Sequence, residues 1–132
     1  MEWHEDYELG VEHIDKQHQE LFRAANRIQS IMDREDDESS RRACEEVVKY
    51  LKSYTLKHFQ DEEFYQISVA YEGYMRHKNI HDEFRKTVLM QEQLMAAEDY
   101  SRDSVAKFLK ILSAWLVNHI TREDQQIVPK ET

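Results

Sequence analysis

The scarcity of chain-breaking residues constrains this sequence more than any other feature, because 132 residues contain only two Gly and one Pro. A β-sandwich or barrel of this length would need a turn about every ten residues, and turns draw on clusters of Gly, Pro, Asn and Asp. The chain lacks such clusters. We therefore predict an all-α protein built from long helices, and the length suits a single domain over residues 1–132.

Apolar residues recur at intervals of three and four along four segments, which predicts helices at about residues 13–34, 40–67, 74–97 and 102–126. The inward stripe of the first segment reads Ile14, Leu21, Ala25, Ile28 and Met32. That of the second reads Cys44, Val47, Leu51, Tyr54, His58, Glu62 and Tyr65. Ser39 or Ser40 is expected to cap the second helix and Ser101 the fourth, while Pro129 bars further regular helix.

Four helices of similar length joined by short breaks predict an up-down-up-down four-helix bundle. The first dozen residues fall outside the periodic pattern and contain apolar side chains such as Trp3 and Tyr7. We expect this segment, about residues 1–12, to form an N-terminal arm that packs across the bundle.

Charge and hydropathy exclude several classes of partner. The formal net charge of −9 disfavours nucleic acid and anionic membrane surfaces. We expect no membrane span, because no apolar run approaches 20 residues, and a cytoplasmic location, because the acidic N-terminus is unlike a secretory signal. Cys44 is the only cysteine, so no thiolate metal cluster is available.

Seven histidines remain to be explained. His58 and Glu62, like His77 and His81, are four residues apart and so project from one face of a helix, where a pair can bind a metal. His119 and Asp124 are five residues apart, which puts them about 140° apart on a regular helix, so Asp124 must reach across or the helix must loosen there.

The up-down-up-down topology collects these residues at one end of the bundle. His18 lies near the start of the first helix, His58 and Glu62 near the end of the second, His77 and His81 at the start of the third, and the last two candidates at the end of the fourth. Burying five imidazoles and two carboxylates together without a metal would leave many polar groups unsatisfied. We therefore predict a metal centre. The other two histidines, His4 and His13, are expected at the surface.

Counting donors favours two metal ions. Seven ligands exceed the four of a structural zinc site. If both carboxylates bridge, the side chains supply nine bonds and a shared oxo or hydroxo group supplies two more, one fewer than two octahedra require. Mixed imidazole and carboxylate donors suit iron, although ligand type alone leaves manganese and zinc open. A vacant position on a pair of irons indicates a small ligand such as dioxygen.

Five sequence segments give the chain a resemblance to the hemerythrin family, specifically its bacterial hemerythrin-like domains. They are Trp3, Ile14-Asp15-x-Gln17-His18-x-x-Leu21-Phe22, His58-Phe59-x-x-Glu62-Glu63, His77-x-x-x-His81 and Trp115-x-x-x-His119-Ile120-x-x-x-Asp124. The resemblance spans nearly the whole chain and preserves the family's order of segments. One departure is Tyr71-Glu72, where Tyr-Pro is common in the family.

The resemblance implies a division of the ligands between two non-heme irons. By it, His77, His81 and His119 bind one iron, His18 and His58 bind the other, and Glu62 and Asp124 bridge them. It also implies that Phe59, Trp115 and Leu116 form an apolar wall of an oxygen pocket. Asp15 either orients an imidazole or provides a favourable charge in the first helical turn.

The leading functional hypothesis is a non-enzymatic module that binds dioxygen reversibly for storage, delivery or sensing. The predominance of histidine supports it, since oxygen-activating bundles of the ferritin-like kind use mostly carboxylates with Glu-x-x-His pairs. The alternative is a diiron enzyme acting on peroxide, nitric oxide or ferrous iron. A third possibility is a sensory input domain. The sequence identifies no protein partner.

Overall fold

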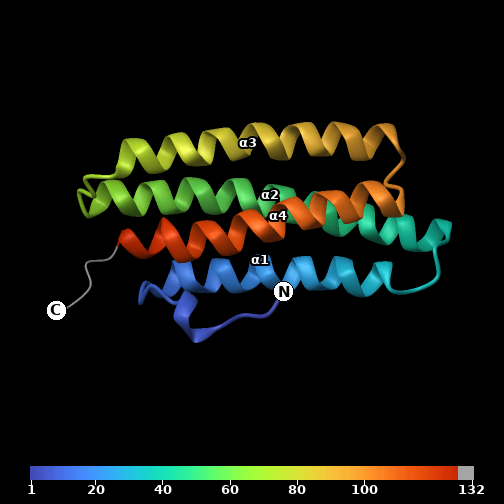
Figure 1. Ribbon diagram of the computed structural model, residues 1–132, viewed down its shortest axis with the longest axis horizontal. Coiled ribbons are helices and arrows are strands. Elements are labelled where there is room, and N and C mark those ends of the chain that lie inside the picture. The colour runs from blue at the N-terminus through green and yellow to red at the C-terminus, as the bar shows by residue number, and fades with distance from the viewer. Residues whose placement is uncertain (128–132) are drawn as a thin grey trace.

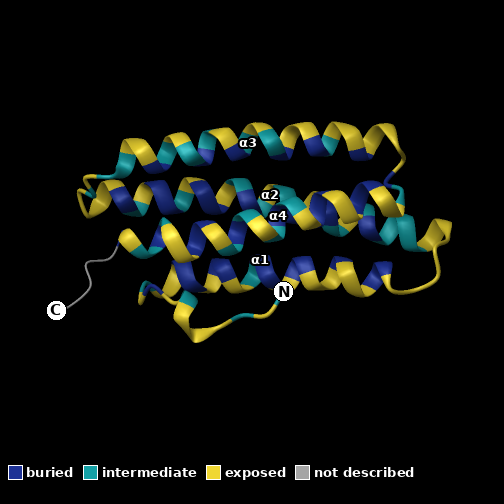
Figure 2. Ribbon diagram, in the orientation of Figure 1, coloured by how far each residue is buried: buried dark blue, intermediate teal, exposed yellow. Residues whose placement is uncertain are grey.

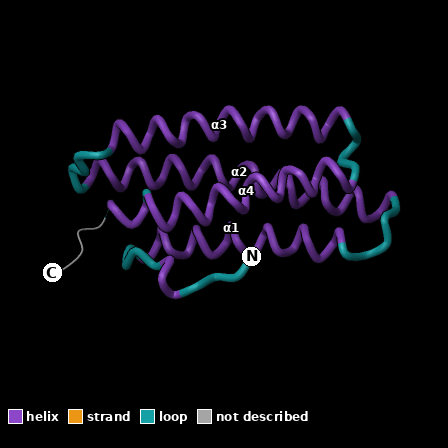
Figure 3. Tube along the Cα trace, in the orientation of Figure 1, coloured by secondary structure: helices purple, strands orange, loops and turns teal. Residues whose placement is uncertain are grey.

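The computed structural model describes residues 1–127 and contains four long helices. They are α1 (Glu12–Met32), α2 (Glu38–Ser68), α3 (Tyr74–Ala97) and α4 (Arg102–Arg122), with short 3₁₀ turns η1 (Glu5–Tyr7) and η2 (Asp124–Gln126). Consecutive helices run in opposite directions, and short loops join them at the two ends of the bundle (Figures 1 and 3). The prediction of an all-α, up-down-up-down four-helix bundle is confirmed.

The helices bury their facing sides and expose the outer ones (Figure 2). In α1 every residue of the predicted stripe is buried, and Ile14, Leu21 and Ile28 are fully inaccessible. No helix within residues 1–127 is long and apolar enough to cross a membrane.

The inward face of α2 differs from the predicted stripe. Val47, Tyr54 and Tyr65 are only half-buried, whereas Val48 and Thr55 face the core. At each of these three positions the next residue along the chain is the buried one, because the core-facing side takes a four-residue step after Cys44, Leu51 and Glu62 where the prediction took three. Cys44, Leu51, His58 and Glu62 belong to both patterns and are buried.

The N-terminus of α2 also corrects the prediction, because neither Ser39 nor Ser40 caps it. The side chain of Asp37 accepts a hydrogen bond from the backbone N–H of Ser40 at 2.8 Å, and the helix begins at Glu38. A carboxylate at this position adds a favourable interaction with the helix dipole. In α4 the predicted cap is confirmed, since the Ser101 hydroxyl accepts from the Ser104 N–H at 3.3 Å.

The α2–α3 connection, where the sequence has Tyr71-Glu72, closes with a left-handed residue. Ala70 has φ of 54°, and the Tyr71 N–H donates to the Gln66 carbonyl at 2.9 Å, as in a Schellman cap. The Tyr71 ring folds over Gly73, where an added Cβ would lie 2.6 Å from ring atoms. A larger residue at position 73 would require the Tyr71 side chain to shift. Helix α3 begins at Tyr74.

The N-terminal arm packs across the bundle as predicted. The Trp3 ring lies edge-on to Tyr7 and Phe22, with both centroid distances 5.4 Å. Asp15 holds the end of the arm, because its carboxylate oxygens accept from the backbone N–H groups of Leu9 at 2.8 Å and Gly10 at 3.0 Å. Asp15 therefore contacts no imidazole, and its expected role as an acceptor for one is wrong.

Candidate metal centre

All seven predicted ligands lie at the end of the bundle formed by the start of α1, the end of α2, the start of α3 and the end of α4 (left in Figure 1). Each is at most 3% exposed. Within residues 1–127 their side-chain donor atoms form two overlapping groups. The first contains Glu62, His77, His81, His119 and Asp124, and the second contains His18, His58, Glu62 and Asp124.

Asp124 reaches the cluster because the regular α-helix does not continue to it: the chain tightens into a 3₁₀ turn there, where the sequence spacing led us to expect a loosening or a reach across. Regular α4 ends at Arg122, and Asp124 begins the 3₁₀ turn η2. The change of helical pitch moves its side chain from the outer face to a fully buried position. Pro129, which was expected to end the helix, lies outside the described residues.

Three imidazoles of the first group converge through the same ring atom. The Nε2 atom of His119 lies 3.0 Å from that of His77 and 3.1 Å from that of His81. Three Nε2 atoms cannot all satisfy one another by hydrogen bonding, because a neutral imidazole has either a proton or a lone pair at this atom. A cation among them would accept all three lone pairs.

Each buried carboxylate directs one oxygen toward each group. Oε1 of Glu62 lies 2.7 Å from His77 Nε2 and 3.2 Å from His81 Nε2, whereas its Oε2 lies 3.5 Å from His18 Nε2 and 3.2 Å from His58 Nε2. Asp124 repeats this division. Its Oδ1 is 3.0 Å from the Nε2 atoms of His77 and His119, and its Oδ2 is 3.1 Å from that of His18. This arrangement fits two ions that share both carboxylates.

Protonation shows how strongly the cluster attracts positive charge. Burial would lower the pKa of His18 and of His77, but the acceptor oxygens and negative charge of Asp124 and Glu62 raise each pKa to about 9. Burial lowers the pKa of His58, which stays neutral. Burial would raise the pKa of Glu62, yet the surrounding imidazoles hold it well below its usual range.

Hydrogen bonds within the cluster leave several of its buried polar atoms without a partner. Within residues 1–127, both ring nitrogens of His18, Oε2 of Glu62 and both oxygens of Asp124 lack a well-aligned hydrogen bond. Each such buried atom costs roughly 1–3 kcal/mol. The donor set, five imidazoles and two carboxylates without a thiolate, suits iron and fits a pair of ions better than a single tetrahedral one.

Two further side chains, which the sequence did not single out, contact imidazoles of the cluster through the ring nitrogen that faces away from it. The Nδ1 atom of His81 lies 2.7 Å from Oε2 of Glu63, and the Nδ1 atom of His58 lies 2.8 Å from Oε1 of Gln17. Both partners are buried. Their only signal in the sequence was their place next to a predicted ligand, within the segments that carry the resemblance.

Two of the three predicted wall residues contact the three-histidine group directly. Phe59 stacks on His81 with centroids 4.1 Å apart, and Trp115 stacks on His119 at 4.2 Å. Leu116 is buried in the core. Beside His18 the neighbouring aromatic ring is that of Trp3, with a centroid distance of 6.4 Å. An apolar environment around His18 therefore includes the arm, which the sequence analysis did not connect with the metal centre.

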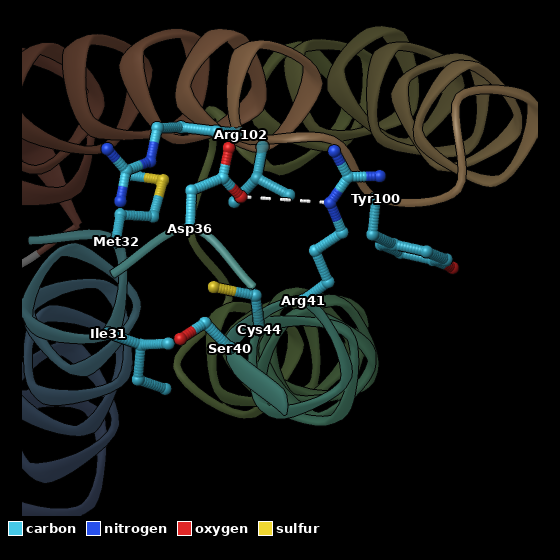
Figure 4. Close-up of a pocket in the computed structure, with 9 residues that line it drawn as sticks. Ile31, Met32, Asp36, Ser40, Arg41, Cys44, Tyr100 and Arg102 are labelled. Carbon is cyan, nitrogen blue, oxygen red and sulfur yellow. Dashed lines mark ion pairs between the residues drawn. The ribbon is translucent and has the colours of Figure 1, made fainter. Parts of the chain in front are cut away.

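The remaining histidines and the cysteine lie apart from the cluster. His4 and His13 are exposed and belong to neither group. Cys44 lies on α2 fourteen residues before His58, about 21 Å along the helix. It lines a small cavity at the opposite end of the bundle, beside the Asp36–Arg41 ion pair (Figure 4). Burial raises the pKa of its thiol, as expected of a small core residue.

Comparison with known proteins agrees with this geometry. Residues 9–130 match the model of a family described as the hemerythrin HHE cation binding domain. The chain belongs to the hemerythrin family. Among its hemerythrin relatives, it is 30% identical to a bacteriohemerythrin of Clostridium acetobutylicum over 96% of this chain and 97% of the relative.

Two further relatives come from other lineages. A bacteriohemerythrin of Pseudomonas aeruginosa is 32% identical over 92% of this chain and 75% of the relative. A myohemerythrin of Theromyzon tessulatum is 30% identical over 93% of this chain and 87% of the relative. The family model thus covers the four helices and the η2 turn that carries Asp124.

Proposed function

We propose that this protein binds dioxygen reversibly at a pair of non-heme irons. The observation that carries the proposal is the division of each carboxylate between the two histidine groups, with one oxygen of Glu62 and of Asp124 directed to each. Bridging carboxylates hold two ions close enough to react with one small molecule. The relatives' names, bacteriohemerythrin and myohemerythrin, support the same class of function.

The donor count indicates which ion is open to a ligand. The group of His77, His81 and His119 offers three nitrogens and two carboxylate oxygens, whereas the group of His18 and His58 offers two nitrogens and two oxygens. If the two ions also shared one oxo or hydroxo group, the first would have six donors and the second five. We place dioxygen on the His18–His58 side. A reduced iron pair supplies the two electrons that make oxygen binding favourable there.

The protein's own residues restrict access to this site. On the dioxygen side, the centroid of the Phe59 ring lies 6.1 Å from that of His58, and the centroid of the Trp3 ring lies 6.4 Å from that of His18. On the other side Phe59 stacks on His81, Trp115 stacks on His119, and Leu116 is buried. Together they place apolar surface where water would otherwise deliver protons. Excluding protons slows irreversible oxidation of the irons, so this packing favours reversible binding over turnover.

An oxygen titration tests the proposal. The iron-loaded protein is reduced without air and titrated with dioxygen, while visible absorption and iron content are measured. We expect two irons per chain and a spectrum that reverses when oxygen is removed. One zinc ion and no iron after growth with ample iron would contradict the proposal. Continuous consumption of oxygen with an added reductant would instead favour the enzymatic alternative.

Two matched histidine variants give this test a control. His81→Ala removes one donor from the three-histidine group, so we expect loss of one or both irons and of the oxygen-dependent spectrum. His13→Ala removes an exposed imidazole outside both groups and is expected to leave iron content and spectrum unchanged. Equal iron content in the two variants would remove His81 from the proposed ligand set.

A further inference from the structure

In each metal-binding group, one imidazole is within hydrogen-bond distance, through its Nδ1 atom, of a side chain outside the group. The two hydrogen-bond networks differ in charge. His81 meets the carboxylate of Glu63, which also pairs with Arg85 at 2.8 Å. His58 meets the amide oxygen of Gln17, whose own Nε2 donates to Oδ2 of Asp61 at 2.7 Å. The negative charge therefore touches the imidazole directly in one network and stands one residue further away in the other.

This difference changes how strongly each imidazole donates electrons. An imidazole that binds a cation through Nε2 has its proton on Nδ1, and the group that accepts this proton sets the basicity of the ring. A carboxylate acceptor makes a shorter, charge-assisted hydrogen bond and draws the proton further from the ring than an amide does. His81 should therefore be a stronger Nε2 donor than His58.

The surroundings of Glu63 also make its contact more rigid. Its side chain is 11% exposed, and Arg85 pairs with both Glu63 and Asp82 while lying 5.5 Å from the centroid of the Phe59 ring. Phe59 in turn stacks on His81 with an interplanar angle of 12°. The matching network at His58 ends at Lys57, which is 64% exposed and 3.2 Å from Asp61.

We propose that Glu63 is a positioning residue that makes the two metal subsites unequal, so that the three-histidine group binds its ion first and releases it last. The inference rests on the proposed two-ion function but goes beyond it, since it assigns an order of loading. The first group already has the higher expected metal affinity, because it offers three imidazoles and the second offers two. The carboxylate of Glu63 increases this difference in affinity.

Cobalt(II) titration of the metal-free protein measures the order of loading. Ligand-field absorption and native mass spectrometry together report the number of ions bound and the affinity of each step. We expect two steps for the unaltered protein. Glu63→Gln keeps the shape and the acceptor oxygen but removes the charge, and is expected to weaken the tighter step by roughly 10–100-fold while leaving the looser one unchanged.

A matched control separates this effect from the general loss of a negative charge. Glu46→Gln makes the same change on the same helix at an exposed position far from the cluster, and should leave both steps unaltered. Circular dichroism of each metal-free variant checks that the helices are retained. If Glu63→Gln weakened both steps equally or neither, the assignment of Glu63 would be overturned, although two bound ions would leave the proposed function standing.

A second variant tests the role of the acceptor's charge by moving a negative charge closer to His58 instead of removing one near His81. In the double variant Gln17→Glu/Asp61→Asn the net charge is unchanged, but a carboxylate now faces the Nδ1 atom of His58. We expect the looser step to tighten by about tenfold or more, so that the two steps approach each other. An unchanged or weaker looser step in a folded variant would contradict the role given to the acceptor's charge. Failure of the unaltered protein to bind two ions would overturn the proposed function and this inference together.

Discussion

Metal-free protein should lose stability as the pH rises from 7 to 9.5. The folded state raises the pKa of His18 and of His77 from 6.5 to about 9, because Glu62 and Asp124 favour the charged imidazoles despite their burial. A raised histidine pKa gives stability that is complete below the unfolded value of 6.5 and disappears as the pH passes 9. The loss therefore falls within the alkaline range.

The size of the loss follows from the shift. A difference of 2.5 pH units corresponds to about 3 kcal/mol, of which about 2.5 kcal/mol per histidine is lost between pH 7 and 9.5. The two histidines share the same carboxylates, so we expect their joint loss to be between about 2.5 and 5 kcal/mol. That is a large part of the stability of a domain this size.

Burial would lower the pKa of His119, but Asp124 and Glu62 raise it, so this histidine adds to the loss in the same pH range. The remaining groups affect stability in other pH ranges. The lowered pKa of His58 affects stability below pH 6.5, and the raised pKa of Tyr50 and of Tyr54 acts above pH 10. Burial raises the pKa of the Cys44 thiol above 9, which would add a small loss of the same sign. Measurements are therefore made in a Cys44→Ala background and stop at pH 9.5.

Urea unfolding, followed by circular dichroism in the presence of a chelator, gives the free energy of unfolding at each pH. His18→Gln should reduce the pH dependence, and the exposed control His13→Gln should retain all of it. Iron-loaded protein should lack this loss, because the ions occupy the positions that protons take in the metal-free cluster. A metal-free stability that stays constant or rises from pH 7 to 9.5 would refute the electrostatic account of the cluster.

Three further predictions concern the rest of the fold. Ala70→Gly should raise the free energy of unfolding by about 1 kcal/mol in urea titrations, since a left-handed residue with a Cβ is strained; a loss of stability would mean that the φ of 54° is not adopted. Hydrogen exchange in metal-free protein should be faster around His77 than around Cys44, because only the first end loses its ions, and equal rates would contradict this. Leu116→Ala should cost about 2–5 kcal/mol and, at equal iron content, hasten decay of the oxygenated spectrum by admitting water; decay at the parental rate would place the pocket elsewhere.

The sequence alone was sufficient to predict the bundle and the end at which the seven candidate ligands meet. Few chain-breaking residues and apolar stripes predicted four helices, and alternating helix directions put His18, His58, His77 and His119 at one end. These predictions rest on periodicity and connectivity, which are properties of the chain itself. Even there, a three-residue step in place of a four-residue one misplaced Val47 and Tyr54 on α2.

Only the tertiary structure decided what each side chain near the centre contacts. Asp15 lies in the first turn of α1, as one of its two expected roles required, but its carboxylate accepts backbone N–H groups from the arm and contacts no imidazole. Gln17 and Glu63 instead contact imidazoles on neighbouring helices. The 3₁₀ turn that follows α4 directs Asp124 into the cluster. Spacing in sequence specifies a helix face, but the rotation and axial shift of one helix against another come from side-chain packing across the whole core. Because a shift of about 1.5 Å exchanges one residue for the next, the contacts between helices are decided by that packing.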